Sequence, residues 1–482
     1  MKLSELISPE QLTGPDTEIT GLTLDSRAVE PGFLFAALPG LHVNGRDFIP
    51  QAIKAGAAAI LTEPDIDTGN VRAIRDADPA ARFATIAARF YPRQPDVIAA
   101  VTGTNGKSST VDFLRQIWRR AGIDGASLGT LGVARGEDWV ETGYTTPDAA
   151  AVHKALNELA DDNCTHLAME ASSHGLKQKR IDGVRVTLTG FTNLTQDHLD
   201  YHPDFKDYFS SKLKLFLELA PGGSPAIINV DSEWGEQVAA KCTARGLDVV
   251  QVGWRGSDWR IREITPKAAS QQVTLEVLGN TKRIELPLVG EFQVANAVSA
   301  AAMAVQSGVS EDAALAAIGK LEGVPGRLEL AARTIDGCPV LVDFAHTPDG
   351  LDKLIRAVRP HTRGRVVIVF GCGGDRDPTK RKSMGEIAVN LADQVFVTDD
   401  NPRSEDAAII RAKIMEGAIG AEEVGDRAAA IRTALRQLKP GDTLLLAGKG
   451  HETGQKIGDT THPFDDREEA RKAVAELGGG DD

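Results

Sequence analysis

Short apolar runs separated by polar or glycine-rich segments recur along the chain and predict alternating strands and helices. From about residue 96 to 329, runs that suit buried strands are followed by segments long enough for a helix, which is typical of a mostly parallel sheet with crossover helices. The pattern restarts at about residue 330 and continues to residue 482. The strands predicted in these two regions are Val97–Val101, Leu167–Glu170, Leu188–Asn193, Ala226–Val230, Val340–Phe344, Arg365–Phe370, Gln394–Thr398 and Thr443–Ala447.

The first region, residues 1 to about 95, differs because glycine and proline interrupt its apolar runs. Gly21–Arg27 and Gly32–Gly40 each contain a short candidate strand. Short strands broken in this way fit a small α/β domain. We therefore predict an α/β protein of three domains, 1–95, 96–329 and 330–482. Ligands of open α/β sheets bind at the carboxyl ends of the strands, so the polar loops that follow the strands of the third domain are candidates for half of an active site.

The segment after Val97–Val101 predicts a phosphate site. It reads Thr-Gly-Thr-Asn-Gly-Lys-Ser-Ser at residues 102–109. Glycine lets backbone N–H groups approach phosphate oxygens, Lys107 can bring its charge to the outer phosphates, and the Ser108 hydroxyl can reach a bridging metal ion. A helix is predicted next, ended by Gly122, with its apolar face at Val111, Leu114, Ile117, Trp118 and Ala121.

Charge and composition narrow the class of partner. The 482 residues include 54 Lys and Arg against 68 Asp and Glu, a net charge of −14 that disfavours nucleic acid. No apolar run reaches the length of a membrane span, and the first residues do not resemble a signal peptide. We expect a cytoplasmic protein without nucleic-acid binding or membrane insertion. The cysteines have no paired spacing, which favours buried thiols over a disulfide framework or a structural metal site: Cys164, Cys242, Cys338 and Cys372.

Carboxylates and imidazoles gather after two of the predicted strands. Glu170 ends one strand and is followed by Ser172, Ser173 and His174. Residues 193–202 include Asp197, His198, Asp200 and His202. Such ligands suit Mg²⁺ better than zinc, because no cysteine joins them. We expect His198 to bind the metal, whereas for His174 and His202 a hydrogen-bonded structural role is the simpler interpretation.

The phosphate loop is unusually short, since two residues separate Gly103 from Gly106, and in this it resembles the Mur ligases and their folate-glutamating relatives. Further motifs follow in order, and together they make the chain similar to the Mur ligases over nearly its whole length: Tyr144–Asp148, Met169–Leu176, Asp197–His202, Gly290–Ala297, Gly326–Arg327, Asp343–Asp349 and Gly448–Glu452. The resemblance implies the three-domain Mur ligase architecture, with a central mononucleotide-binding parallel sheet and a Rossmann-like C-terminal domain.

The resemblance further implies residues for ATP and for Mg²⁺. ATP is expected to contact Gly103, Thr104, Asn105, Gly106, Lys107, Ser108, Ser109, Asn296, Arg327, Asp343 and His346. Mg²⁺ is expected to be held by Ser108, Glu170, His198 and Lys212, the last as a carbamylated lysine (N6-carboxylysine). Lys107, Lys212 and His198 are the expected catalytic residues. Tyr208 and Lys212 are four residues apart, so they should share a helix face.

Within the family, the chain resembles the branch that adds the third residue of the peptidoglycan stem peptide. UDP-N-acetylmuramoyl-L-alanyl-D-glutamate is then expected to bind at Leu24, Ser26, Leu41, His42, Val43, Thr145, Thr146, Ser172, Gln178 and Arg180. The amine substrate, meso-diaminopimelate, is expected at Arg376, Asp400, Asn401, Pro402, Arg403, Gly448 and Glu452. The planar forks of Arg180 and Arg403 suit carboxylates.

The expected reaction is ATP-dependent amide synthesis through an acyl phosphate, with small-molecule substrates and a monomeric enzyme. A folylpolyglutamate synthetase would share the phosphate loop but lack a domain for a uridine nucleotide and the loop Asp400–Arg403. A binding protein gated by ATP would close its domains without making an amide. A dinucleotide oxidoreductase does not fit, because Lys107 follows Gly106 and no Gly-x-Gly-x-x-Gly turn follows that strand.

Overall fold

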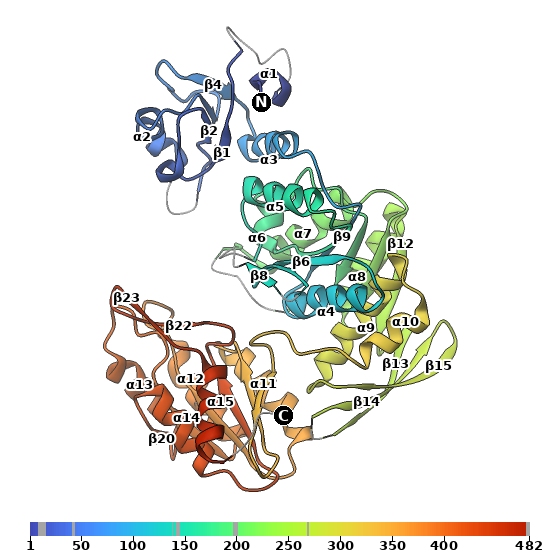
Figure 1. Cartoon of the computed structure of the whole chain (residues 1–482), viewed down its shortest axis with the longest axis vertical. Coiled ribbons are helices and arrows are strands. Elements are labelled where there is room, and N and C mark those ends of the chain that lie inside the picture. Colours follow the sequence, from blue (N-terminus) through green and yellow to red (C-terminus); the bar gives the residue numbers. More distant parts are fainter. Residues whose placement is uncertain are drawn as a thin grey trace. The chain divides into compact units, whose positions relative to one another are not determined.

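The computed structural model describes residues 1–7, 16–40, 44–136, 138–140, 145–195, 201–267 and 269–478. Contacts among the described residues divide the chain into two compact units, one of residues 1–259 and 299–314, the other of residues 260–298 and 315 onward (Figure 1). Each unit mixes helices with largely parallel strands. The predicted α/β class is therefore confirmed, while the boundaries of the three predicted domains stay a prediction.

The first unit begins with a small parallel sheet of order β1-β2-β3-β4. Its strands are only three or four residues long, as glycine and proline predicted. Leu34, Leu61 and Phe83 belong to its core. The elements are α1 (Leu3–Leu6), β1 (Gly21–Thr23), η2 (Ser26–Ala28), β2 (Phe33–Ala36), η3 (Gly45–Phe48), α2 (Ile49–Lys54), β3 (Ala59–Thr62), β4 (Arg72–Arg75) and α3 (Pro79–Phe90).

A larger sheet follows in the same unit, and within it the strands β12-β11-β10-β5-β9-β6 are parallel neighbours. An antiparallel meander, β6-β7-β8, completes one side. The four strands predicted here are confirmed to within two residues. The bounds are β5 (Val97–Thr102), β6 (Gly125–Gly129), β7 (Gly132–Arg135), β8 (Asp138–Val140), β9 (His166–Glu170), β10 (Leu188–Phe191), β11 (Pro225–Asn229) and β12 (Asp248–Gly253).

Helices cover this sheet. Of the apolar residues predicted for helix α4, Val111, Leu114, Ile117 and Trp118 are buried, whereas Ala121 is the exposed C-cap. Gly122 follows with a positive φ of 79°. Helix α4 packs on β5, β6 and β9, so the loop before it lies at the carboxyl end of β5. The further helices of this unit are α4 (Lys107–Arg120), α5 (Ala149–Asp161), α6 (Ser173–Lys177), α7 (Phe205–Lys214) with the π-turn η4 (Leu215–Leu219), and α8 (Glu233–Arg245). The boundary between the two units falls within α9 (Glu291–Gln306) and again within α10 (Glu311–Ile318).

The second unit contains a sheet of order β16-β17-β21-β18-β19-β20, parallel except for β16. Helices α11, α12 and α13 pack on one face of it, and α14 and α15 on the other. A parallel sheet covered on both faces is the Rossmann-like arrangement that was predicted. Its strands are β16 (Glu329–Arg333), β17 (Pro339–Asp343), β18 (Val366–Phe370), β19 (Gln394–Val397), β20 (Glu422–Glu423) and β21 (Thr443–Ala447).

The second unit also contains the helices that pack on this sheet and, among the described residues, five further strands. Among these strands, β14 pairs with β15 and β22 pairs with β23, both antiparallel. These helices and strands are β13 (Trp259–Pro266), β14 (Gln271–Val277), β15 (Asn280–Leu286), α11 (Pro348–Val358), η5 (Arg359–His361), α12 (Lys380–Leu391), α13 (Ala407–Met415), α14 (Arg427–Arg436), β22 (Gly454–Ile457), β23 (Thr460–Pro463) and α15 (Asp466–Glu476).

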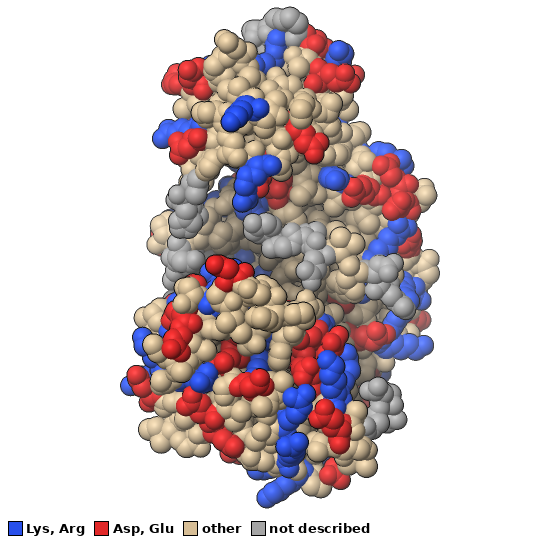
Figure 2. Space-filling model, turned by 60° about the vertical axis from the view of Figure 1, so that its left-hand side comes forward, with Lys and Arg blue, Asp and Glu red and all other residues tan. Residues whose placement is uncertain are grey.

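The cysteines are buried, as the sequence predicted. All four cysteines are buried and unpaired, and burial raises the pKa of Cys242 to about 12 and that of Cys372 to about 11. Positive and negative side chains are interspersed over the face drawn in Figure 2. Among the described helices, none combines the length and apolar character that crossing a membrane requires.

Candidate active site

The phosphate loop lies between the end of β5 and the start of α4. Gly103 and Gly106 have φ values of 151° and 84°, and Gly106 is the N-cap of α4. The first N–H groups of a helix have no partner within the helix, so the N-terminus of α4 offers donors to an anion. Ser108 lies in this first turn, and Ser109 beside it is buried. This backbone geometry fits the predicted phosphate site.

The end of β10 fixes the conformation of this loop. The Asn193 backbone carbonyl accepts a hydrogen bond from the Thr104 N–H at 2.9 Å, and Asn193 Oδ1 accepts one from the Asn105 N–H at 3.0 Å. Thr192 Oγ1 donates to the Asn105 carbonyl at 2.6 Å. Thr104 Oγ1 lies 3.0 Å from the Tyr208 hydroxyl. Two neighbouring elements thus hold the loop in place.

Gly103→Ala should lower turnover by at least about a hundredfold, because a small misplacement of catalytic groups has effects of that size. A Cβ atom at Gly103 would lie 1.9 Å from Thr192 Oγ1 and 3.1 Å from the backbone N and O of Asn193. Thr192 would have to give up its bond to Asn105, and the loop would move. Rates of phosphate release at saturating substrate concentrations measure the effect.

Gly122→Ala is the matched control, since Gly122 also has a positive φ, 79°, but an added Cβ would meet nothing within 4 Å. It should lower stability by about 1 kcal/mol and leave turnover unchanged. Wild-type turnover in Gly103→Ala, or equal losses in the two variants, would contradict the role given to the loop.

Two lysines converge on the same carbonyl of the phosphate loop. Lys107 Nζ donates to the backbone oxygens of Gly103 at 3.0 Å and Thr104 at 2.8 Å. Lys212 Nζ donates to the Gly103 oxygen at 2.7 Å. Lys212 is buried, with its ammonium 4.5 Å from the centre of the Tyr208 ring, so the predicted shared helix face is confirmed. Both cationic side chains therefore lie where phosphate charge would be brought.

Glu170 fits the predicted metal site. Its Oε1 accepts hydrogen bonds from Ser108 Oγ at 2.9 Å and from the Thr130 N–H at 2.8 Å. Its Oε2 is buried and has no hydrogen-bond partner among the described residues. A buried carboxylate oxygen normally has a partner, and a hard cation such as Mg²⁺ would supply one. Within the described part of the chain, no three His, Cys, Asp or Glu side chains gather as a metal cluster.

The three histidines singled out from the sequence differ in what the structure shows of them. His198 lies outside the described residues, so its predicted role as a ligand stays a prediction. His202 is fully buried, with Nδ1 2.6 Å from Asp207 Oδ2 and Nε2 3.0 Å from Ser173 Oγ. These contacts agree with the structural role predicted for it. Hydrogen bonds from Lys177 and His202 lower the pKa of Asp207. The centre of the His174 ring lies 3.9 Å from that of Tyr201, with the two ring planes tilted by 36°.

The residues predicted to hold the muramyl dipeptide are joined by hydrogen bonds. Thr146 Oγ1 donates to the Glu170 carbonyl at 2.9 Å and accepts from the Ser172 N–H at 3.1 Å. Arg180 Nη1 donates to the Thr146 carbonyl at 2.6 Å. Nε and Nη2 of Arg180 donate to Gln178 Oε1 at 3.0 and 2.6 Å. The fold thus brings together, next to Glu170, Thr145, Thr146, Ser172, Gln178 and Arg180.

The residues predicted to bind the uridine nucleotide are described only in part. Ser26 is buried, and its hydroxyl donates to Gln51 Oε1 at 3.1 Å. Leu24 packs against the core of the small sheet. The loop Leu41, His42 and Val43 lies outside the described residues. The uridine nucleotide site therefore stays a prediction.

In the second unit, a series of contacts connects the remaining residues that are predicted to bind ATP. Asn296 Nδ2 donates to Gln293 Oε1 at 3.2 Å, and Gln293 Nε2 donates to the Arg327 carbonyl at 3.3 Å. The Arg327 guanidinium lies 4.8 Å from the centre of the Phe344 ring. His346 Nδ1 lies 2.9 Å from the Phe344 carbonyl.

Asp343 is fixed beside them. Its carboxylate accepts hydrogen bonds at 2.8 Å from the N–H groups of Leu328 and Ala345. Desolvation raises the pKa of Asp343, although the charge of Arg327 opposes this shift. A carboxylate with fixed backbone donors keeps one orientation, which suits the ribose contact predicted for it.

His451 should make the protein sensitive to acid. Its ring lies 5.4 Å from that of Phe344. Burial, and then the charges of Arg327 and Arg467, lower the pKa of His451 from 6.5 to about 4. Between these values the unfolded chain binds a proton that the folded protein excludes. Stability should therefore fall as the pH drops through this window, by up to about 1.4 kcal/mol per pH unit for this group.

His451→Asn should remove that contribution. Urea unfolding of both proteins at pH values from about 7.5 to about 4.5 measures it, because the carboxylates act in both proteins and cancel in the difference. The variant's free energy of unfolding should fall less steeply with decreasing pH. Curves that stay parallel would show that His451 is not the group responsible.

Three loops that follow neighbouring strands hold the residues predicted for the amine substrate. Asn401 Nδ2 donates to Glu452 Oε2 at 2.8 Å, and Arg403 Nη1 donates to the Gly374 carbonyl at 2.8 Å. A Cβ atom at Gly448 would lie 2.8 Å from Asp400 Oδ2. The strands are neighbours in the order β21-β18-β19. Asp400, Asn401 and Pro402 are buried, whereas Arg376 is exposed on the loop after β18.

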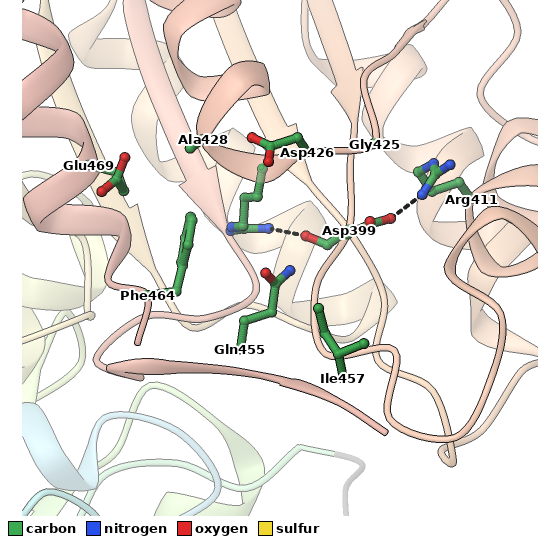
Figure 3. A pocket seen from close by; sticks show the side chains of 10 residues that line it. Asp399, Arg411, Gly425, Asp426, Ala428, Gln455, Ile457, Phe464 and Glu469 are labelled. Carbon is green, nitrogen blue, oxygen red and sulfur yellow. Dashed lines mark hydrogen bonds and ion pairs between the residues drawn. The ribbon is translucent and has the colours of Figure 1, made fainter. Parts of the chain in front are cut away.

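A pocket of about 450 Å³ is lined by Asp399, the residue directly before the loop Asp400–Arg403 (Figure 3). Gln455 lines it and donates to the Asp400 carbonyl at 2.7 Å. Both of its arginines are paired: Arg411 with Asp399, and Arg427 with Asp466 in a fully buried pair at 2.7 Å. The lining includes none of the side chains predicted to bind the amine. The pocket is therefore separate from the residues predicted to bind the amine.

Sequence reasoning missed several groups that shape the site. Thr130 and Thr192 were not identified, and the Tyr208 hydroxyl was not linked to the phosphate loop. Lys449 is the clearest omission, because it lies in a quoted motif and is fully buried beside Asn401 and Glu452. The signal was its position between two glycines directly after a strand, since a lysine there is within reach of a ligand site.

The phosphate loop, the buried carboxylate and the Rossmann-like unit define a multidomain ligase that uses a nucleotide. Family models match three segments: "Mur ligase family, catalytic domain" over residues 18–91, "Mur ligase middle domain" over 101–304 and "Mur ligase, glutamate ligase domain" over 326–450. These segments cover most of the chain. The chain belongs to the Mur ligase family.

Individual relatives carry one particular name. Proteins from Brucella melitensis and a Chelativorans species, each named UDP-N-acetylmuramoyl-L-alanyl-D-glutamate--2,6-diaminopimelate ligase, are 48% and 49% identical to this chain. The alignments cover 98% of both chains for the first and 99% of both chains for the second. A solved structure with the same name in its title has a TM-score of 0.74 and 31% identity, and the match covers 100% of both chains.

Proposed function

We propose that the protein joins meso-diaminopimelate to the D-glutamate of UDP-N-acetylmuramoyl-L-alanyl-D-glutamate, with ATP as the energy source, in peptidoglycan precursor synthesis. The observation that carries this proposal is the amine site, where Asn401 and Glu452 from separate loops are joined at 2.8 Å beside Arg403. Anionic and cationic groups in one place suit a substrate that has both ammonium and carboxylate ends. The named relatives support the same substrates.

The reaction proceeds through an acyl phosphate. The γ-carboxylate of D-glutamate attacks the γ-phosphorus of ATP, and ADP leaves. The neutral amine then attacks the acyl carbon, and the tetrahedral intermediate expels inorganic phosphate while the amine loses its proton. Lys107 offsets the negative charge that spreads over the transferred phosphoryl group, and the fixed loop N–H groups orient the phosphates.

Mg²⁺ fits the residues at the carboxyl end of β9. Ser108 and Glu170 would hold it, together with His198 and a carbamylated Lys212. When bound, Mg²⁺ supplies positive charge that stabilises the phosphoryl oxygens. Arg180, anchored to Thr146 and Gln178, orients the carboxylate end of the muramyl dipeptide. We further propose that the protein works as a monomer in the cytoplasm, where ATP and the nucleotide-linked precursor are available.

Two other functions make different predictions. A folylpolyglutamate synthetase has no need of a first domain for a uridine nucleotide, whereas residues 18–91 match a Mur ligase model. A binding protein gated by ATP would not form an amide.

The deciding experiment measures phosphate release with each substrate omitted in turn, together with mass spectrometry of the product. Release that requires ATP, the muramyl dipeptide and the diamino acid supports the proposal. Release with a folate and glutamate, or hydrolysis of ATP without an amide product, would overturn it.

A further inference from the structure

Lys449 is an unusual lysine, because its side chain is fully buried in the loop after β21. Lysine is rarely buried without an ionic partner, since removing an ammonium from water is costly. Here Nζ donates to Asn401 Oδ1 at 3.1 Å, to Glu452 Oε2 at 3.1 Å and to the Gly454 carbonyl at 2.7 Å. The three hydrogens of the ammonium thus have three acceptors, and two of them belong to the predicted amine site.

The contacts of Lys449 fix the orientation of the Asn401 amide. Asn401 Oδ1 accepts from Lys449 Nζ and from the Lys456 N–H at 2.9 Å, while Asn401 Nδ2 donates to Glu452 Oε2 at 2.8 Å. A flipped amide would turn its NH₂ group toward the ammonium and its oxygen toward the carboxylate. The ammonium therefore allows only the orientation in which both partners are satisfied.

Lys449 also holds the Glu452 carboxylate through a single oxygen, Oε2, which carries the bonds from Lys449 and Asn401. The Glu452 side chain is 34% exposed, so the carboxylate stays accessible to a substrate ammonium.

We propose that Lys449 is a positioning residue of the amine site, which sets the orientation of Asn401 and Glu452 and thereby the affinity for the diamino acid. This inference rests on the proposed function, because it assigns Asn401 and Glu452 to that substrate. Lys449 acts through these two residues. Its loss should therefore raise the KM for meso-diaminopimelate and leave the KM values for ATP and the muramyl dipeptide unchanged.

The test is Lys449→Met, which preserves the length and volume of the side chain and removes the charge. Assays with the wild-type protein come first, since an inactive wild type with meso-diaminopimelate would refute the proposed function and not this inference. With an active wild type, we expect the KM for meso-diaminopimelate to rise at least about thirtyfold, the scale of losing charged hydrogen bonds. The KM for ATP should stay within about threefold. Lys413→Met, an exposed lysine of α13, is the matched control and should match the wild type.

A double-mutant cycle distinguishes positioning from a general structural role. Because Lys449 acts through Asn401 and Glu452, Asn401→Ala combined with Lys449→Met should raise the KM for the diamino acid by clearly less than the product of the two single effects. Additive effects would contradict the proposal, as would an unchanged KM or a parallel loss of affinity for all three substrates. If Lys449→Met does not fold, Lys449→Gln, which keeps a donor, takes its place. Failure of both variants to fold would assign Lys449 to stability and overturn the proposal.

Discussion

Lys212→Ala should lose at least about a hundredfold in turnover, and a short carboxylic acid added to the assay should restore part of it. Lys212 is 2% exposed and donates to the Gly103 carbonyl at 2.7 Å, so its Nζ is fixed at the phosphate loop. A carbamate on Lys212 would add a carboxylate-like anion there. The carbamate nitrogen keeps one N–H, and the bond to Gly103 can therefore persist in the modified protein. A diffusible carboxylate can replace the lost anion in the space that alanine leaves.

Lys214→Ala is the matched control, because Lys214 is two residues further along the same helix and its side chain is not buried. It should retain wild-type turnover and gain nothing from added carboxylate. Intact-protein mass spectrometry in bicarbonate buffer reports the modification independently of activity. Full activity of Lys212→Ala in bicarbonate-free buffer would rule out the role.

The strands and the phosphate loop could be predicted because their causes are local. Apolar runs such as Arg365–Phe370 leave few alternatives to a buried strand, and the structure has β18 at Val366–Phe370. Gly103 and Gly106 mark the turn, and the periodic apolar residues define α4. Because parallel strands end at the same edge of a sheet, the sequence also indicated where ligands bind.

The contacts between loops could not be predicted in this way. Asn401 and Glu452 are 51 residues apart, and the bond between them depends on the strand order β21-β18-β19. Lys449 has no sequence feature that distinguishes a buried ammonium from an exposed one. Its burial follows from three acceptors that only the folded chain brings together.

The backbone conformation near the arginines predicted to bind ligands could not be predicted from the sequence either. Lys179, Leu328 and Asp375 have positive φ values of 58°, 49° and 53°, and each is adjacent to an arginine predicted to bind a ligand: Arg180, Arg327 and Arg376. Arg403 itself has a φ of 54°. Residues other than glycine adopt this conformation at an energetic cost, and such strain gathers at functional sites. Residue preferences give no reason to expect a positive φ at lysine, leucine or arginine, so only the structure reveals this conformation.

The wild-type protein should prefer meso-diaminopimelate over L-lysine by roughly ten-thousandfold in kcat/KM, the scale reached when a buried polar group loses its partner. The two amines differ in the distal carboxylate that L-lysine lacks. Arg403 is partly buried and is held by its backbone, which donates to the Lys456 carbonyl at 3.0 Å and accepts from the Gly458 N–H at 2.7 Å. Its Nη1 donates to the Gly374 carbonyl at 2.8 Å. A guanidinium fixed in this way offers its fork to a carboxylate.

Arg403→Ala should narrow the preference mainly by losing activity with meso-diaminopimelate, by at least about a hundredfold, because a charged bidentate contact disappears. Alanine keeps the same left-handed backbone requirement, so the substitution adds little strain of its own. Activity with L-lysine is the internal control and should change by less than about threefold, since L-lysine has no distal carboxylate for Arg403 to bind. Arg403→Lys retains the charge without the fork and should recover only a small part of the preference. Comparable kcat/KM values for the two amines in the wild-type protein would refute the assignment of the amine substrate, yet the ligase assignment would stand, because it depends on the phosphate loop and Glu170.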